Sequence, residues 1–210
     1  MRRLFVFGDS YTQKWEYNSP YSMWKGYTPK TYSELISEEL GIECFNFSWG
    51  GWSNYDIFEA VCQNIDSIKE NDIVIILWSG LDRIRLVNHR LNMWVSIQPN
   101  SFNMLKRVEL IDDDISENTI DELMINRQHN LYKEEVRNWI KLLKHTFKSN
   151  IFINSTWYGV NWGIDVAQYE TIVEESNNQM IDWHWSEKGQ YDFAQWCISK
   201  IKTDKFVGVN

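Results

Sequence analysis

The sequence has little of the residues that break or cross-link a chain. Its 210 residues include 3 Pro, 10 Gly and 3 Cys. So few prolines and glycines exclude a disordered or collagen-like chain. The cysteines, Cys44, Cys62 and Cys197, are odd in number and form no close pair, which indicates neither a zinc site nor a disulfide framework. We expect three core thiols in a chain that folds on its own hydrophobic core.

Positive charge and long apolar runs are also scarce. The chain has 21 Lys plus Arg against 29 Asp plus Glu, a formal net charge of -8, which argues against nucleic acid as a partner. No run of about 18 apolar residues exists, so no membrane span is expected. The start of the chain leads straight into a short apolar run, which is typical of a strand and not of a signal peptide. We expect a soluble protein, cytoplasmic by default, of unknown oligomeric state.

Short apolar runs alternate with amphipathic stretches along the chain. The strands are predicted at Leu4–Phe7, Glu43–Phe47, Asp72–Trp78 and Ile151–Asn154, and the helices at about Thr31–Leu40, Asn54–Ile68 and Leu131–Phe147. Such alternation predicts a parallel sheet in a three-layer α/β/α domain. We expect one domain, 1–210, with loop insertions at about 11–29 and 84–130. Both follow strand ends, where loops shape the binding crevice of such a sheet.

A Gly-Asp-Ser turn follows the first predicted strand and ends at Ser10. A tight turn there places a hydroxyl at the carboxyl edge of the sheet, where it can act as a nucleophile. The same tripeptide is also ordinary turn and helix-capping chemistry. Other motifs must therefore decide between these interpretations.

Two further motifs follow the Gly-Asp-Ser turn along the chain. Asn46 lies near the end of the second predicted strand and Gly51 follows it five residues later, and Asp182 and His184 precede Gly189 near the C-terminus. With the Gly-Asp-Ser turn, this order resembles the SGNH/GDSL hydrolase family. The resemblance implies a flavodoxin-like fold and hydrolysis of an ester or thioester through an acyl-serine intermediate, with no metal and no organic cofactor.

The resemblance also implies a role for each matching residue. Ser10 would be the nucleophile, His184 the base and then the acid, and Asp182 the carboxylate that orients the imidazole. The backbone N–H groups of Ser10 and Gly51 would bind the oxyanion, with Gly50 as the neighbouring alternative to Gly51. A glycine fits there because the backbone must approach the substrate closely.

The chain departs from the family pattern in two places. The family usually has its Asp three residues before the His, whereas Asp182 lies two before His184. The family also has an Asn after the third strand that donates to the oxyanion, and Leu81 occupies that position and cannot donate. Losing one such donor typically costs about 10² to 10³ in rate. The predicted substitute donors are Asn54, Arg83 and Asn154.

Aromatic residues gather around these motifs. The chain has 12 Trp, and the aromatic residues expected to line the substrate are Tyr11, Trp49, Trp52, Trp183 and Trp185. Because aromatic faces stack on sugar rings, the first substrate prediction is an acetylated carbohydrate. The alternatives are a lipid-ester or thioester hydrolase and a degenerate, non-catalytic carbohydrate-binding module. If the rings prove to be buried, they belong to the core.

Overall fold

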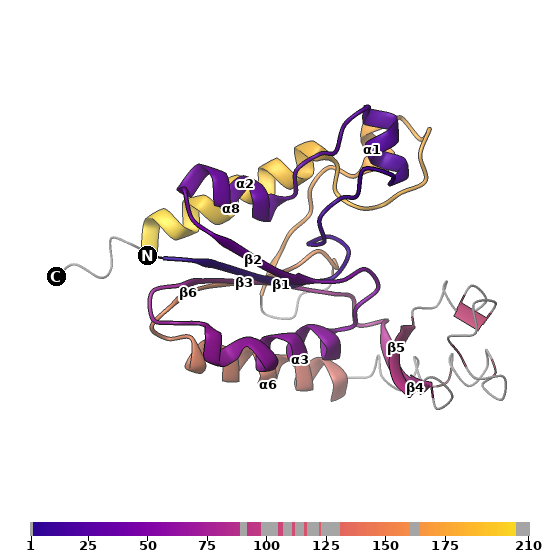
Figure 1. Cartoon of the computed structure of the whole chain (residues 1–210). Coiled ribbons are helices and arrows are strands. Elements are labelled where there is room, and N and C mark those ends of the chain that lie inside the picture. The colour runs from indigo at the N-terminus through magenta and orange to yellow at the C-terminus, as the bar shows by residue number, and fades with distance from the viewer. Residues whose placement is uncertain are drawn as a thin grey trace.

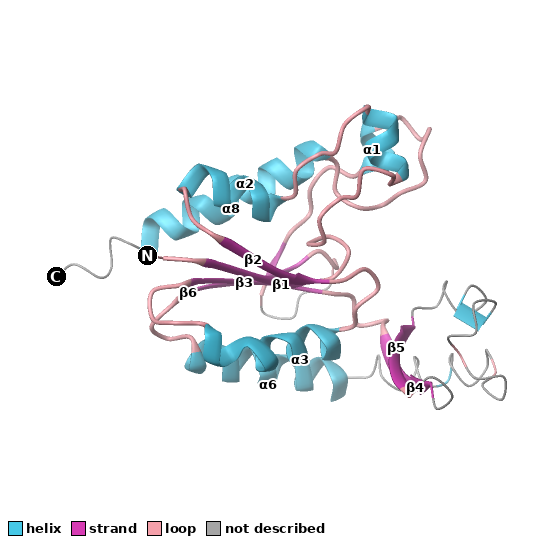
Figure 2. Cartoon of the chain, viewed as in Figure 1, coloured by secondary structure: helices cyan, strands magenta, loops and turns pink. Residues whose placement is uncertain are grey.

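The computed structural model describes residues 2–88, 92–97, 131–159 and 164–204, together with positions 105, 106, 111, 116 and 122. Its centre is a sheet with the strand order β2-β1-β3-β6-β7, in which every neighbouring pair is parallel (Figure 2). The strands are β1 Leu4–Gly8, β2 Cys44–Ser48, β3 Ile73–Trp78, β6 Ile151–Thr156 and β7 Asp165–Val166. The predicted parallel sheet is therefore confirmed.

Helices cover both faces of this sheet (Figure 1). One face packs against α2 and α8, and the other against α3 and α6. The helices are α2 Tyr32–Leu40, α3 Asn54–Asn64, α6 Leu131–Thr146 and α8 Glu187–Asp204. This is the three-layer α/β/α fold that the alternating pattern predicts.

The central strands are apolar on both faces because each face is covered. In β1, Leu4 and Val6 lie in the cluster under α2 and α8, whereas Phe5 and Phe7 lie in the cluster over α3 and α6. All five residues of β1 and all six of β3 are buried. Continuous apolar runs are what strands covered on two sides require. These runs made β1 and β3 recognisable in the sequence.

The predicted element boundaries are close to those of the structure. The predicted helix over Asn54–Ile68 corresponds to α3, which ends at Asn64 and is followed by the short 3-10 helix η1 Ile65–Ser67. Helix α3 begins where Ser53 and Asp56 form a capping box, and Thr31 and Glu34 do the same for α2. Such reciprocal caps satisfy backbone N–H groups that the first turn leaves without partners.

The two expected loop insertions contain regular structure. The first holds α1 Pro20–Lys25, and the second holds a hairpin of β4 Ile84–Asn88 and β5 Met93–Ile97. Most of the second insertion beyond the hairpin lies outside the described residues. A further short helix, α7 Ile172–Glu175, precedes α8. Within the described ranges, no helix is long and apolar enough to cross a membrane.

The three cysteines differ in their surroundings. Cys197 is buried and Cys44 is half-buried against the core, but Cys62 is exposed on α3. The expectation of three core thiols is therefore wrong for Cys62, which lies on the outer side of its helix. Burial raises the pKa of Cys44 to about 11 and raises that of Cys197 well above its ordinary value.

Thiol labelling of the folded protein should distinguish these cysteines. The thiolate is the reactive form, and burial raises the pKa of all three thiols, to about 11 for Cys44. Cys62 is the thiol that is exposed to a reagent, whereas Cys197 is buried. We expect a chromogenic disulfide reagent to label one thiol rapidly, and Cys62→Ser to remove that fast phase. The unfolded protein in denaturant should release three equivalents. Fast labelling that persists in the Cys62→Ser variant would contradict this packing.

Candidate active site

Ser10 lies two residues after the end of β1, at the carboxyl edge of the sheet. The chain turns sharply there, because the N–H groups of Thr12 and Gln13 both donate to the carbonyl of Asp9, at 3.0 and 3.1 Å. Ligands of open α/β sheets bind outside the carboxyl ends of the strands. The turn therefore presents the Ser10 hydroxyl where a substrate can reach it.

Three side chains form a hydrogen-bonded series at this edge. The Oγ of Ser10 lies 2.7 Å from Nε2 of His184, and Nδ1 of His184 lies 2.6 Å from Oδ1 of Asp182. The same carboxylate oxygen accepts the backbone N–H of His184 at 2.9 Å. A spacing of two residues is thus enough for Asp182 to reach the ring.

The carboxylate of Asp182 is held in its charged form. Burial by itself would raise the pKa of Asp182, but the hydrogen bonds from the ring and backbone of His184, and the charge of that ring, hold it below its ordinary value. A carboxylate behind an imidazole fixes the tautomer and stabilises the ring when it takes up a proton. The three side chains are thus within hydrogen-bond distance of one another in the order Ser10, His184, Asp182.

Backbone contacts fix the segment that carries Asp182 and His184. The carbonyl of His184 accepts from the N–H of Ile172 at 2.8 Å, and that of Asp182 from the N–H of Val173 at 3.0 Å, both at the start of α7. On the other side, the hydroxyl of Tyr11 donates to the carbonyl of Trp183 at 2.8 Å. Burial and the charge of Asp9 raise the pKa of Tyr11, so this hydroxyl remains a donor.

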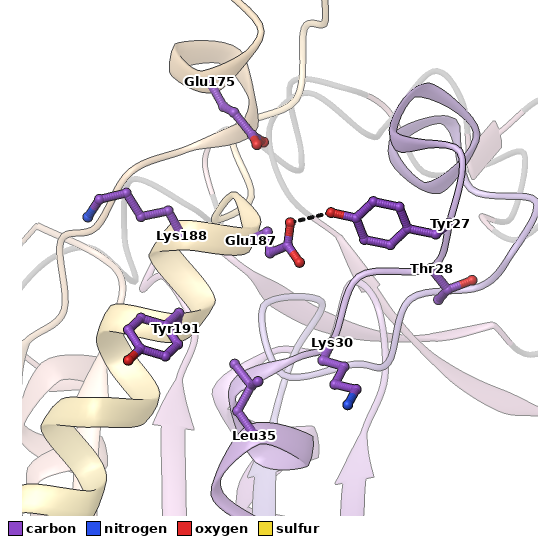
Figure 3. A pocket seen from close by; sticks show the side chains of 8 residues that line it. All are labelled: Tyr27, Thr28, Lys30, Leu35, Glu175, Glu187, Lys188 and Tyr191. Atoms are coloured by element: carbon purple, nitrogen blue, oxygen red, sulfur yellow. Dashed lines mark hydrogen bonds between the residues drawn. The ribbon is translucent and has the colours of Figure 1, made fainter. Parts of the chain in front are cut away.

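A cluster of partly exposed charges contacts the same segment from α1. Lys25 at the end of α1 pairs with Glu175 of α7 at 2.8 Å and with Glu187 of α8 at 3.0 Å. The hydroxyl of Tyr27 donates to Glu187 at 2.6 Å, at the mouth of a cavity of about 580 Å³ between α8 and the chain around Tyr27 (Figure 3). Because Glu187 follows His184 by three residues, this cluster restrains the position of the histidine.

Asp9 connects the loops that surround Ser10. Its side chain is fully buried and accepts the N–H of Tyr11 at 3.1 Å, the hydroxyl of Ser79 at 2.8 Å and the indole N–H of Trp157 at 2.9 Å. Arg83 forms an ion pair with it at 3.0 Å. These partners follow β1, β3 and β6, so one carboxylate fixes three loops at the carboxyl edge.

The glycine proposed for the oxyanion has the backbone that its role requires. Gly51 has a φ of +85°, and a Cβ built on it would have no atom within 4 Å. Other residues rarely adopt this φ, and the space beside Gly51 is open. Leu81, in contrast, is 9% exposed and packs in the cluster over α3 and α6.

Two of the three predicted substitute donors already have partners within the protein. The Asn54 amide donates to the carbonyl of Ser79 at 3.1 Å and accepts its N–H at 2.7 Å. Arg83 donates to the carbonyl of Trp52 at 2.9 Å, besides pairing with Asp9. Both therefore hold the loop structure. Asn154 lies on β6 with its amide oxygen buried and without a hydrogen-bond partner among the described residues.

The aromatic residues expected to line the substrate divide into two groups. Trp49 and Trp183 are 64% and 65% exposed. Trp185 is 2% exposed and Tyr11 is 8% exposed, and both pack in the core under α2 and α8. The expectation for these two is corrected, since neither presents a free face. Trp52 is half-buried against the opposite core.

Sequence reasoning did not single out Trp15. Its ring stands edge-on to that of His184, with centroids 6.0 Å apart. The segment 11–29 has no hydrophobic period, so nothing in the sequence distinguished this tryptophan from its aromatic neighbours. Its position follows only from the course of the chain after the Ser10 turn.

Solved structures of similar shape include esterases and lipolytic proteins. An acetyl xylan esterase from Butyrivibrio proteoclasticus is 12% identical with a TM-score of 0.41, over 97% of this chain and 64% of that one. This chain thus spans less than two thirds of that protein. Lipolytic proteins of the G-D-S-L family from Desulfitobacterium hafniense and Veillonella parvula are 11% and 15% identical, with TM-scores of 0.40 and 0.38. They match over 96% and 97% of this chain and 99% of each of theirs.

No family model matches the chain, and no curated protein matches its sequence.

Replacing Asp9 should destabilise the fold strongly. Asp9→Ala leaves the guanidinium of Arg83, only 6% exposed, without its counter-charge. Removing one partner of a buried ion pair typically costs about 3–5 kcal/mol. We expect a loss of that size in urea denaturation monitored by circular dichroism. Asp192→Ala, which breaks an exposed pair with Lys188 on α8, is the control and should change stability little. Equal stability of the two variants would contradict the role of Asp9.

Proposed function

We propose that this protein is a serine ester hydrolase that removes O-acetyl groups from carbohydrates through an acyl-serine intermediate. The observation that carries the proposal is the hydrogen-bonded series of Ser10, His184 and Asp182 at the carboxyl edge of the sheet. The contacts of this series match the requirements of nucleophilic catalysis by a serine, which needs a base within hydrogen-bond reach and a third group that orients the base.

The reaction follows from these contacts. Nε2 of His184 takes the proton of Ser10 as Oγ attacks the acetyl carbonyl carbon. The resulting oxyanion accepts hydrogen bonds from the backbone N–H groups of Ser10 and Gly51. As the tetrahedral intermediate collapses, His184 gives its proton to the departing sugar oxygen. A water molecule that loses a proton to His184 then attacks the acyl-serine, and acetate leaves as Ser10 regains its hydrogen.

The two exposed tryptophans support a carbohydrate substrate. Trp49 lies next to the Gly50–Gly51 turn, and Trp183 lies between Asp182 and His184. Both side chains are largely exposed to solvent. Such faces stack on the apolar side of a sugar ring while its hydroxyl groups stay in water. A fatty acyl chain would instead require an aliphatic channel, so the lipid-ester alternative has less support.

The decisive experiment is acetate release by the purified protein. We expect the wild type to release acetate from acetylated sugars and Ser10→Ala to lower kcat by at least about a thousandfold, because the nucleophile is lost. Ser149→Ala is a matched control. Ser149 is exposed in the loop before β6, at the edge of the sheet opposite to the one that carries Ser10. It should retain full activity.

Activity that survives in Ser10→Ala would refute the assignment of Ser10 as the nucleophile. If the wild type binds sugars but hydrolyses no ester, including the activated p-nitrophenyl acetate, the chain is a carbohydrate-binding module and the proposed enzyme is wrong. Equal losses in Ser10→Ala and Ser149→Ala would show a general defect and would also refute the proposal.

A further inference from the structure

A second cavity, of about 520 Å³, runs along the outer edge of the sheet. One of its walls is β2, the edge strand, and the other is the segment 13–16 that follows the Ser10 turn. Its volume is in the range of pockets that hold small ligands. We call it the β2 groove. Trp49, one residue beyond β2, lies at its end.

The β2 groove lies next to the Ser10 site. A Cβ built on Gly50 would lie 3.9 Å from the Cβ of Ser10 and 2.9 Å from the side-chain oxygen of Gln13, so Ser10 and Gln13, which lines the groove, both lie close to Gly50. Trp15 lines the groove and also stands edge-on to His184. Residues that line the groove therefore lie beside both Ser10 and His184, so a ligand longer than a single sugar can contact the site and the groove together.

The chemistry of the lining indicates what the groove binds. Four of its ten lining residues are aromatic and the others are polar or charged, apart from Cys44, and none of the ten is Leu, Ile or Val. The charges are one lysine and one glutamate, which balance. An acyl chain would need aliphatic walls, and an anionic polymer would need a surplus of positive charge. A neutral, hydroxyl-rich ligand with flat faces needs neither aliphatic walls nor a surplus of positive charge, and it fits an aromatic and polar lining.

Hydrogen-bonding groups are available for such a ligand. The side-chain amide of Gln13 has no hydrogen-bond partner among the described residues, although it carries two donors and an acceptor. In the described sheet no strand pairs with the side of β2 that faces away from β1. An edge strand offers its outward N–H and C=O groups to a partner, and sugar hydroxyl groups both donate and accept.

We propose that the β2 groove binds the glycan chain that continues from the acetylated sugar at Ser10. The ligand class is a neutral oligosaccharide, stacked on Trp49 and hydrogen-bonded by Gln13. This inference rests on the proposed esterase function and extends it, because it makes the substrate a chain of sugars and not a single acetylated sugar. Trp49 and Gln13 are then specificity residues for the part of the substrate beyond the reacting ester.

Chain-length dependence tests the groove. Acetate release is measured on partially acetylated xylo-, manno- and cello-oligosaccharides and on the acetylated monosaccharide of each series. We expect kcat/KM per acetyl group to rise with chain length in at least one series. In that series, Trp49→Ala and Gln13→Ala should each lower the ratio of kcat/KM on the oligosaccharide to that on the monosaccharide by about five- to tenfold, through KM.

Trp24→Ala is the matched control, because Trp24 is an exposed tryptophan on α1 that does not line the groove. It should leave the ratio unchanged. Equal kcat/KM on oligosaccharide and monosaccharide in every series would overturn the proposal that the β2 groove binds the glycan. So would a ratio that the Trp49 and Gln13 variants do not change. An absence of hydrolysis on all substrates, p-nitrophenyl acetate included, would instead refute the esterase function itself.

Discussion

The buried carboxylate of Asp9 is the constraint on which the site depends. It lies between the last residue of β1 and Ser10, and it collects hydrogen bonds or an ion pair from groups that follow β1, β3 and β6. A buried charge is tolerated only when such partners surround it. The turn that presents Ser10 is thus fixed by the same contacts that hold the neighbouring loops in place.

The histidine side of the site depends on a second set of contacts. Asp182 and His184 lie on a segment held by the start of α7 through backbone hydrogen bonds and by Tyr11 through its hydroxyl. Because Tyr11 also donates its backbone N–H to Asp9, the two sets of contacts meet at one residue. The positions of Ser10 and His184, far apart in the sequence, are therefore coupled through the contacts of Tyr11.

The sequence predicted the layers of the fold, although α8 was not among the predicted helices. It also singled out Ser10, Asp182 and His184, which the structure brings within hydrogen-bond distance, while their catalytic roles stay a prediction. Continuous apolar runs identified β1 and β3, and helical periodicity identified α3 and α6, because buried faces impose a period on the sequence. Helix α1 and the β4–β5 hairpin were not predicted, since short elements within irregular aromatic stretches carry no such period. The sequence also did not predict which tryptophans are exposed. Trp183 and Trp185 are only two positions apart, yet Trp183 faces solvent and Trp185 lies in the core. Whether Asp182 can contact the His184 ring across a spacing of two residues likewise depends on the backbone geometry, which the sequence does not show.

The central claim is that Ser10 is an activated nucleophile. The direct measurement is reaction of the folded wild type with a fluorophosphonate, followed by mass spectrometry of the proteolytic peptides. We expect a single stoichiometric adduct on Ser10 that is absent from the His184→Ala variant, whose serine lacks a base. No adduct on the folded protein, or an adduct on another residue, would contradict it.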